Sequence, residues 1–317
     1  TSGGSEADNQ AILSAAAIGA RKGKKHIIST AFEHHAILHT LKKLEKEGFE
    51  VTLLDVHENG MVSAQQVADA IREDTCLVSV MYANNEIGSI QPIAEIGAVC
   101  KEKGVIFHTD AVQAVGHVHI NVKEENIDML SLSAHKFHGP KGVGLLYARK
   151  GVRLTNIIEG GAQERGKRGG TENVPGIIGL GEAVRTYPQG AAEKMMALKT
   201  RLLTDLQEAI PAAKRNGPEL DDPLCAPHIL SVSLSPVRSQ TMLFALEGDG
   251  IYVSAGSACA AHKQKVSGVL TAMGLSPAEA DCTLRFSLCP DNTEAEMDDV
   301  AQCVKKHYDL LKAYVRR

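Results

Sequence analysis

Short runs rich in β-branched residues alternate with helical patterns through the first half of the 317-residue chain, and this alternation limits its fold more than any other feature. Most of the runs are apolar on both faces, as expected for strands that helices cover on both sides. The pattern predicts an α/β fold with a mostly parallel central sheet and helices on both faces. The predicted strands are residues 26–30, 51–56, 76–83, 105–111, 128–134 and 142–148, and the predicted helices between them are residues 36–48, 92–104 and one opened by the capping-box sequence SAQQ at Ser63.

The pattern changes after the turn sequence TYPQG at residues 186–190. Two long amphipathic helices are predicted there, at about residues 193–210 and 293–312. Between them we expect only three strands, at residues 229–234, 251–254 and 283–288. The sequence therefore predicts a large α/β domain over residues 1–188 and a smaller α+β domain over residues 189–317.

Charge and composition disfavour several classes of protein. Lys and Arg total 34 and Asp and Glu total 38, a formal charge of −4, whereas nucleic-acid-binding surfaces need a clustered excess of basic residues. No apolar stretch approaches the roughly 18 residues that a membrane span needs. The seven cysteines form no C-x-x-C pair, which disfavours a zinc or iron–sulfur site built from local cysteines. We expect free thiols in a reducing cytoplasm.

Polar side chains follow three of the predicted strands at the point where each strand ends. Asn85 follows one strand, Asp110 lies near the end of the next, and Lys136 follows the third. Because ligands of parallel α/β sheets bind beyond the carboxyl ends of the strands, we expect these groups to converge. A lysine that forms a Schiff base and a carboxylate that keeps a pyridine nitrogen protonated are the groups that pyridoxal phosphate (PLP) needs. Two plainer interpretations stay open, a solvated surface position for Lys136 and a helix cap for Asp110.

The small-residue turn TSGGSEADN at residues 1–9 leads directly into a helical pattern. Backbone amides at a helix start, with hydroxyl groups nearby, suit a phosphate, but glycine–serine turns also serve as ordinary caps. The dinucleotide fingerprint G-x-G-x-x-G is absent from this turn, which disfavours a nicotinamide cofactor.

One cysteine and three histidines need separate interpretation. Cys259 lies in the small-residue run SAGSACAA, so it is either an exposed reactive thiol or a structural one, and the local sequence does not choose. His35 and His39 are four residues apart on a predicted helix, but without an H-E-x-x-H pattern we predict no metal site. His34, just before that helix, is better placed to stack over a flat ring.

Several separated motifs together resemble the cysteine desulfurases, which are PLP-dependent, class V aminotransferase-like enzymes of fold type I. The AGSAC form of the cysteine segment resembles the nitrogen-fixation and housekeeping iron–sulfur branch of that family. The motifs span nearly the whole chain, and they are TSGGSEADN, FEHHAIL, YANNEIGSIQPI, HTDAVQAVG, SLSAHKFHGPKGVG, GGAQERGKRGGTENVPG, SAGSACAA and LRFSL.

The resemblance implies a role for each matching residue. Lys136 resembles the Schiff-base lysine, Asp110 the partner of the pyridinium nitrogen, and Cys259 the sulfur acceptor. Arg285 resembles the residue that binds the substrate carboxylate, a task suited to a planar guanidinium. His34 resembles the catalytic residue that stacks on the ring, Gln113 the contact to the ring hydroxyl, and Asn85 a residue that positions cofactor and substrate. The residues that resemble the phosphate site are Gly4, Ser5, Ser133 and His135, joined by Thr171 from the partner subunit.

The resemblance also implies an activity. An enzyme of this kind converts L-cysteine to L-alanine, holds the sulfur as a persulfide on Cys259 in the smaller domain, and passes it to an iron–sulfur scaffold or another sulfur-acceptor protein. We expect a cytoplasmic homodimer that binds PLP in its large domain and uses no nucleic acid, membrane or metal. Two alternatives stay open: a selenocysteine lyase or another class V lyase or aminotransferase, and a truncated subunit that binds partners without turnover.

Three departures from the family pattern lead to further expectations. Relatives normally carry a segment ahead of TSGG, which is expected to help complete the small domain and the dimer. The family sequence RFSLGR reads RFSLCP here, so we expect the backbone after Arg285 to differ. The chain also lacks the longer C-terminal tail that some relatives use to hold a scaffold partner. Lys141, beyond the turn that follows Lys136, is expected to point away from the cofactor.

Overall fold

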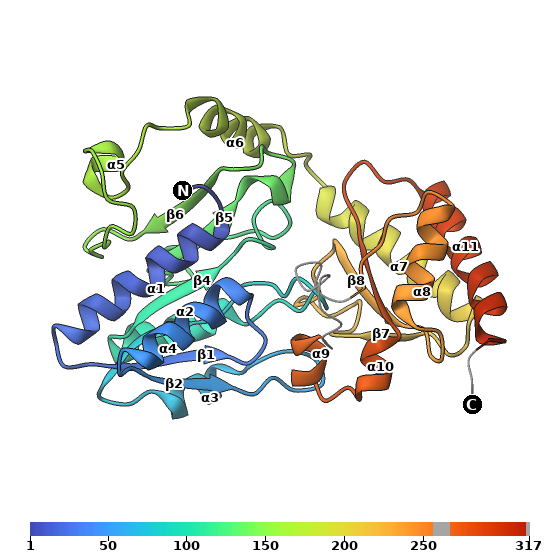
Figure 1. The fold of residues 1–317 in the computed structure, drawn as a ribbon, viewed down its shortest axis with the longest axis horizontal. Helices are drawn as coiled ribbons and strands as arrows, with labels where there is room; N and C mark the ends of the chain where they lie inside the picture. Colours follow the sequence, from blue (N-terminus) through green and yellow to red (C-terminus); the bar gives the residue numbers. More distant parts are fainter. Residues whose placement is uncertain (256–266, 315–317) are drawn as a thin grey trace. The chain divides into compact units, whose positions relative to one another are not determined.

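The computed structural model describes residues 1–255 and 267–314. The chain forms two compact units (Figure 1). Unit 1 consists of Thr1–Asp55, Val62–Ala83 and Gln91–Tyr187, and unit 2 of Val56–Met61, Asn84–Ile90 and Pro188–Arg317. The division into functional domains at residue 188 stays a prediction, and two short segments from the first half of the chain pack with unit 2.

Unit 1 contains a six-stranded sheet in the order β2-β1-β3-β4-β5-β6. The first five strands of that order pair in parallel, and β6 runs antiparallel to β5. All residues of β1, β3 and β5 are buried, as expected for strands covered on both faces. The structure confirms the mostly parallel sheet, whose strands are β1 (His26–Thr30), β2 (Glu50–Leu54), β3 (Thr75–Ser79), β4 (Ile106–Asp110), β5 (Met129–Ser133) and β6 (Gly144–Ala148).

One helix of unit 1, α3, begins at the cap that the sequence predicts. Ser63 accepts a hydrogen bond from the Gln66 amide, and the Gln66 side chain accepts one from the Ser63 amide, so the predicted capping box is confirmed. Helices α1 and α2 pack against each other, as do α3 and α4 (Figure 1). The helical elements are α1 (Gly4–Ala20), α2 (His35–Lys46), α3 (Ala64–Ala70), α4 (Ile93–Lys103), the 3-10 helix η1 (Ala134–Phe137), α5 (Gln163–Gly166) and α6 (Val174–Thr186).

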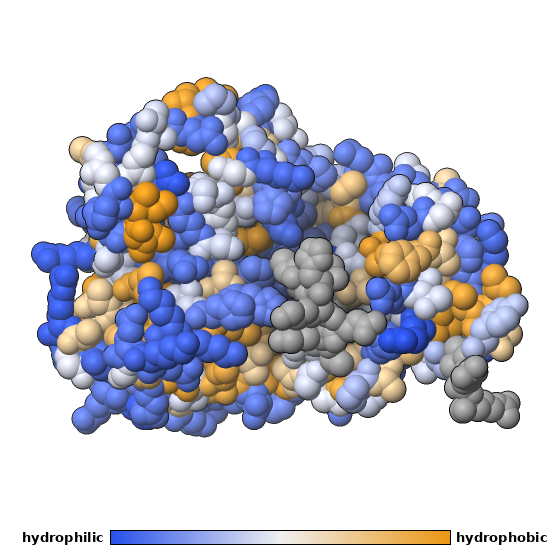
Figure 2. Space-filling view, in the orientation of Figure 1, coloured by the Kyte–Doolittle hydropathy of each residue, from blue (hydrophilic) through white to orange (hydrophobic). Residues whose placement is uncertain are grey.

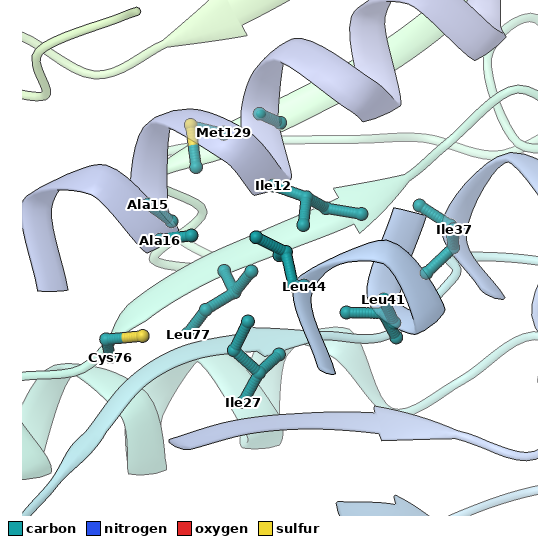
Figure 3. Close-up of a cluster of buried hydrophobic side chains, with 11 residues drawn as sticks. Ile12, Ala15, Ala16, Ile27, Ile37, Leu41, Leu44, Cys76, Leu77 and Met129 are labelled. Atoms are coloured by element: carbon teal, nitrogen blue, oxygen red, sulfur yellow. The ribbon is translucent and has the colours of Figure 1, made fainter. Parts of the chain in front are cut away.

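A cluster of buried aliphatic side chains joins α1 and α2 to the sheet (Figure 3). Ile12 of α1 and Ile37 of α2 are fully buried, and they pack with Ile27 of β1 and Leu77 of β3. Burying a side chain of this size contributes about 1.5–3 kcal/mol, so the cluster fixes α1 firmly on the sheet. The N-terminus of α1 therefore has a fixed position near the carboxyl ends of β4 and β5.

Unit 2 is built around a three-stranded antiparallel sheet in the order β7-β8-β9. The strand predicted over residues 251–254 is wrong, because only Ser254 pairs there, in an isolated bridge with Arg285. Within the part of the chain that the structure describes, no helix combines the length and the apolar character that crossing a bilayer requires. The elements of unit 2 are β7 (Lys214–Asn216), β8 (Ile229–Ser233), β9 (Thr283–Ser287), α7 (Ala191–Ala209), α8 (Ser239–Gly248), α9 (Gly268–Ala272), α10 (Pro277–Asp281) and α11 (Glu294–Lys312).

Residues 84–90 join unit 2 through close backbone contacts. Gly88 donates its amide to the Asn84 carbonyl and accepts the Ala226 amide at 2.8 Å. Its φ of 73° is in the left-handed region, and an added Cβ would lie 3.0 Å from the Ile229 carbonyl oxygen. Glycine is therefore required by both conformation and space at this position.

Candidate functional site

Asp110 is the last residue of β4, and its side chain is 5% exposed. Its Oδ1 atom accepts the Val112 amide at 2.9 Å, which orients the carboxylate beyond the strand end. Burial raises the pKa of Asp110, whereas the Val112 hydrogen bond and the positive charge of Lys136 lower it. A buried carboxylate of this kind is stabilised by a cation placed next to it.

Lys136 lies in η1, which directly follows β5, and β5 pairs with the strand β4 that ends at Asp110. The turn closes through His138, whose φ is 67°, and through the hydrogen bond from the Gly139 amide to the Ala134 carbonyl. The backbone therefore turns sharply at the carboxyl end of β5. This places the exposed Lys136 side chain at the same edge of the sheet as Asp110, and the structure brings the two predicted residues together.

The sequence analysis missed two residues that hold the backbone of Lys136. His117 Nε2 lies 3.3 Å from the Lys136 carbonyl oxygen and must carry the proton that it donates. The Tyr187 hydroxyl then donates to His117 Nδ1 at 2.8 Å. Burial lowers the pKa of His117 to about 4, so its ring is neutral at pH 7. The sequence feature that could have pointed to His117 is its place directly after a glycine, in the turn that follows Asp110.

A cavity of about 350 Å³ opens at the N-terminus of α1. Free backbone amides and the helix dipole make such an end favourable for an anion. Gly4 approaches so closely that an added Cβ would lie 2.6 Å from Val112 Cγ2. The cavity contains four of the five residues that the resemblance assigns to the phosphate, all but Thr171, and its lining residues are Ser2, Gly3, Gly4, Ser5, Glu6, Ser133, His135, Lys141 and Gly142.

Polar and basic side chains from the β5–β6 connection complete this cavity. Ser133 Oγ and His135 Nδ1 are 2.8 Å apart, so each orients the other. Burial lowers the pKa of His135, and the Lys136 charge lowers it further. We expect Lys141 to point away from the cofactor, and the structure places it in the lining of this cavity. The tight turn at Gly139 brings this lysine back toward α1.

His34 precedes the strand-end residues in the sequence, and Gln113 lies between Asp110 and Lys136. His34 is the N-cap of α2, and its Nδ1 atom accepts the Ala36 amide at 3.2 Å. Burial lowers the pKa of His34, and the positive charges of His35 and Lys136 lower it further. Gln113 is half-buried in the turn after β4, three residues beyond Asp110. Both residues belong to unit 1, as Lys136 does.

Arg285 and Asn85 both belong to unit 2. Arg285 lies in the middle of β9, and its Nη1 atom donates to the Asn85 carbonyl at 2.9 Å. Its Nη2 atom donates to Ser254 Oγ at 3.1 Å. Beyond β9, the Cys289 amide donates to Asn292 Oδ1 at 2.8 Å, which turns the RFSLCP sequence toward α11. The expected difference from the backbone of relatives at this point stays a prediction.

Thr171 and Cys259 are the two remaining residues that the resemblance assigns. Thr171 is exposed, in the connection between α5 and α6. Cys259 lies outside the described residues. Among the described residues, no group of three or more His, Cys, Asp or Glu side chains has a metal-binding arrangement.

Comparisons with known proteins agree on one family. The family described as aminotransferase class-V matches residues 1–300. The cysteine desulfurase IscS of Clostridium botulinum is 51% identical over 309 residues, which cover 96% of this chain and 77% of the relative. A solved structure described as a NifS-like protein superposes with a TM-score of 0.89 at 38% identity and covers 98% of this chain and 82% of that one. Another, described as SspA in complex with cysteine, superposes with a TM-score of 0.77 at 39% identity and covers 92% of this chain and 81% of that one. The chain therefore belongs to the aminotransferase class-V family and, within it, to the cysteine desulfurases.

Proposed function

We propose that this protein is a PLP-dependent cysteine desulfurase that converts L-cysteine to L-alanine and takes up the released sulfur as a persulfide on Cys259. One observation carries the proposal: a buried carboxylate, Asp110, and an amine, Lys136, follow adjacent parallel strands beside the cavity at the start of α1. The match to curated cysteine desulfurases gives independent support. A solved relative described in complex with cysteine supports L-cysteine as the substrate.

The residues present fit PLP. The carboxylate of Asp110 is buried, and a protonated ring nitrogen is the kind of cation that would stabilise it. Gly4 leaves no room for a Cβ at the start of α1, and the cavity there offers backbone amides, hydroxyl groups and two basic side chains to a phosphate. We infer that Gly4, Ser5, Ser133 and His135 hold the phosphate, and that Lys141 joins them.

Each remaining group has a defined task in the proposed reaction. When bound, PLP supplies an electron sink that stabilises negative charge at the substrate Cα. Lys136 would hold the cofactor, and its amine, when free, would remove the Cα proton. Arg285 binds the substrate carboxylate, and its guanidinium is already oriented by the Asn85 carbonyl. His34 and Gln113 border the ring, and Asn85 positions cofactor and substrate.

The sulfur transfer balances without an added oxidant. The Cys259 thiolate attacks the sulfur of the bound substrate, the C–S bond breaks, and its electron pair stays on the substrate carbon. Protonation of that carbon completes L-alanine, and Cys259 keeps the second sulfur as a persulfide. The thiolate is the nucleophile in this step, so its rate rises with the fraction of Cys259 that is deprotonated.

We infer that the functional form is a homodimer. Large apolar side chains are exposed along α6, and part of this surface is orange at the upper edge of Figure 2. Val174 is 55% exposed, Ile178 66% and Val184 55%, which favours burial against another surface. Thr171 is exposed three residues before this helix, and we propose that it reaches the phosphate site of a second copy packed against α6.

A sulfur-acceptor protein, such as an iron–sulfur scaffold, is the proposed partner that receives the persulfide sulfur. Six cysteines are free among the described residues. Free thiols are typical of a reducing compartment, and we propose the cytoplasm as the location.

The test is a single-turnover reaction of the PLP-loaded protein with L-cysteine. We expect equal amounts of L-alanine and of protein persulfide, with the extra sulfur found on the peptide that contains Cys259. Cys259→Ser should still bind cysteine but form no persulfide, whereas Cys289→Ser should behave as the unsubstituted protein does. Alanine released without a persulfide, or a persulfide on Cys282 or Cys289, would contradict the proposal.

A further inference from the structure

One carboxylate lines the cavity at the start of α1, where the phosphate is proposed to bind. Glu6 lies in the first turn of α1, and its Oε2 atom accepts the Ser2 amide at 2.9 Å. The side chain of Glu6 is only 9% exposed, so little water screens its charge. By itself, Glu6 would repel a phosphate and oppose the binding that the rest of the cavity favours.

A guanidinium group lies directly against this carboxylate. Arg168 Nε donates to Glu6 Oε1 at 2.9 Å, and Arg168 Nη2 donates to Glu6 Oε2 at 3.2 Å, which is the two-bond geometry of a strong arginine–carboxylate pair. Burial raises the pKa of Glu6, but the hydrogen bonds from Arg168 and Ser2, together with the Arg168 charge, lower it to about 2. Glu6 is therefore ionised at pH 7, and Arg168 is the cation that balances it.

The backbone that carries Arg168 is itself held on α1. Gln10, one turn further along α1 and 2% exposed, donates its Nε2 atom to the Lys167 carbonyl at 2.9 Å and to the Thr155 carbonyl at 3.1 Å. Arg168 Nη1 also donates to the Gly169 carbonyl at 3.2 Å, which orients the guanidinium further. The position of Arg168 beside the cavity is therefore fixed by contacts other than the ion pair.

The charges of the cavity show what Arg168 adds. Three of the residues that line it can carry a charge, Glu6, His135 and Lys141. Burial lowers the pKa of His135, and the Lys136 charge lowers it further, so the His135 ring is neutral at pH 7. Without Arg168, the negative charge of Glu6 would cancel the positive charge of Lys141. With Arg168 paired to Glu6, the Lys141 charge stays available to a phosphate.

We propose that Arg168 is a positioning residue for phosphate binding, which it supports by compensating the charge of Glu6 inside the cavity. This inference rests on the phosphate site of the proposed function. Arg168 contacts Glu6 and not the ligand in this account, so its effect depends on the charge of Glu6. Removing Arg168 alone should weaken phosphate binding, whereas removing both charges together should restore it.

The experiment measures the affinity of the cofactor-free protein for PLP by equilibrium dialysis. We expect Arg168→Gln to weaken PLP binding about 10-fold or more, because the charge of Glu6 is then left uncompensated. Glu6→Gln keeps an acceptor for the Ser2 amide and removes the repelling charge, so it should bind PLP at least as tightly as the unsubstituted protein does. The double variant should recover an affinity within about 3-fold of the unsubstituted protein, because neither charge remains.

Arg72→Gln is the matched control, because Arg72 forms the same two-bond pair with Glu50 in unit 1, outside the lining of the cavity. It should leave the PLP affinity unchanged. Equal weakening by Arg168→Gln and Glu6→Gln, with no recovery in the double variant, would mean that the ion pair only holds the chain in place, and would overturn the inference. So would an affinity of Arg168→Gln within about 2-fold of that of the unsubstituted protein.

A second ligand separates this inference from the proposed function. Inorganic phosphate carries the charge of the cofactor phosphate without the ring, and calorimetric titration measures its binding to the cofactor-free protein. Arg168→Gln should weaken this binding by about the same factor as for PLP, and the double variant should recover it. If the unsubstituted protein makes no alanine from L-cysteine, the proposed function fails while both titrations still test the compensation. Equal phosphate binding by the unsubstituted protein and Arg168→Gln, or none by either, would reject the compensation itself.

Discussion

The two units position their functional side chains by different means. In unit 1, Asp110 and Lys136 follow adjacent parallel strands, so the sheet topology brings them to one edge. In unit 2, Arg285 lies within an antiparallel strand, and its guanidinium is oriented by hydrogen bonds to Asn85 and Ser254. Strand ends depend on the local chain, whereas the contacts of Arg285 join segments 31 and 200 residues away in sequence.

This difference predicts that substitutions in the two units impair different binding steps. A change at a strand end of unit 1 should affect the cofactor, because the surrounding backbone stays in place. A change at Arg285 should affect the substrate and leave the cofactor bound. The following substitutions test that separation, beginning with the largest expected effect.

Lys136→Ala should abolish the absorbance of lysine-bound cofactor and lower turnover by about 10²–10⁴-fold, because the variant loses both the anchoring amine and the proton acceptor. Borohydride reduction followed by peptide mapping is the measurement. Lys150 is exposed, and Lys150→Ala should keep the absorbance and the turnover of the unsubstituted protein. A reducible lysine adduct that persists in Lys136→Ala, for example at Lys141, would assign the site to another residue.

Arg285→Ala should weaken L-cysteine binding by roughly 2–5 kcal/mol, the cost of leaving a buried charged partner alone. PLP content should stay nearly the same, since Arg285 belongs to unit 2. Titration of the cofactor spectrum with L-cysteine measures the change in affinity. The affinity of Arg285→Lys for L-cysteine should fall between those of the unsubstituted protein and Arg285→Ala. An unchanged affinity for cysteine would mean that another group holds the carboxylate.

The pH dependence of stability should report the buried His117. Its pKa is about 4 in the folded protein and near 6.5 when unfolded, so the unfolded chain binds a proton first as the pH falls. Its contribution is complete above pH 6.5 and is lost progressively down to about pH 4, by up to about 3 kcal/mol. Urea unfolding at several pH values should therefore show a flatter profile for His117→Gln. If the free energy of unfolding changed with pH equally in the unsubstituted protein and in His117→Gln between pH 4 and 6.5, the neutral state assigned to the His117 ring would be contradicted.

Thr171→Ala should loosen PLP by roughly 1.5–3 kcal/mol, the value of one hydrogen bond to a charged acceptor. If the residue acts across a dimer, mixing Lys136→Ala with Thr171→Ala subunits should restore one intact site in each mixed dimer. Equilibrium dialysis of PLP and the activity of the mixture are the measurements. A monomeric protein with full PLP occupancy would reject the shared site.

The alternation of strands and helices was sufficient to predict the parallel sheet and most strand positions. It was also sufficient to place Asp110 and Lys136 at one edge, because parallel strands end on the same side of a sheet. The strand predicted at residues 251–254 failed, since β propensity there is not matched by a pairing partner beyond Ser254. The motifs identified the family, and the comparisons confirm that the chain belongs to it.

By itself, the sequence determined the fold class, and it predicted which side chains lie at the strand ends and which turn suits a phosphate, because each depends on residues close together in the chain. Only the tertiary structure decided that His117 and Tyr187 hold the Lys136 carbonyl, and that Arg168 reaches Glu6 across 162 residues. These contacts leave no periodic signal, because a hydrogen bond between distant segments depends on how the elements pack. The sequence therefore predicted the groups with proposed chemical roles, and the packing of the elements decided which residues hold them in place.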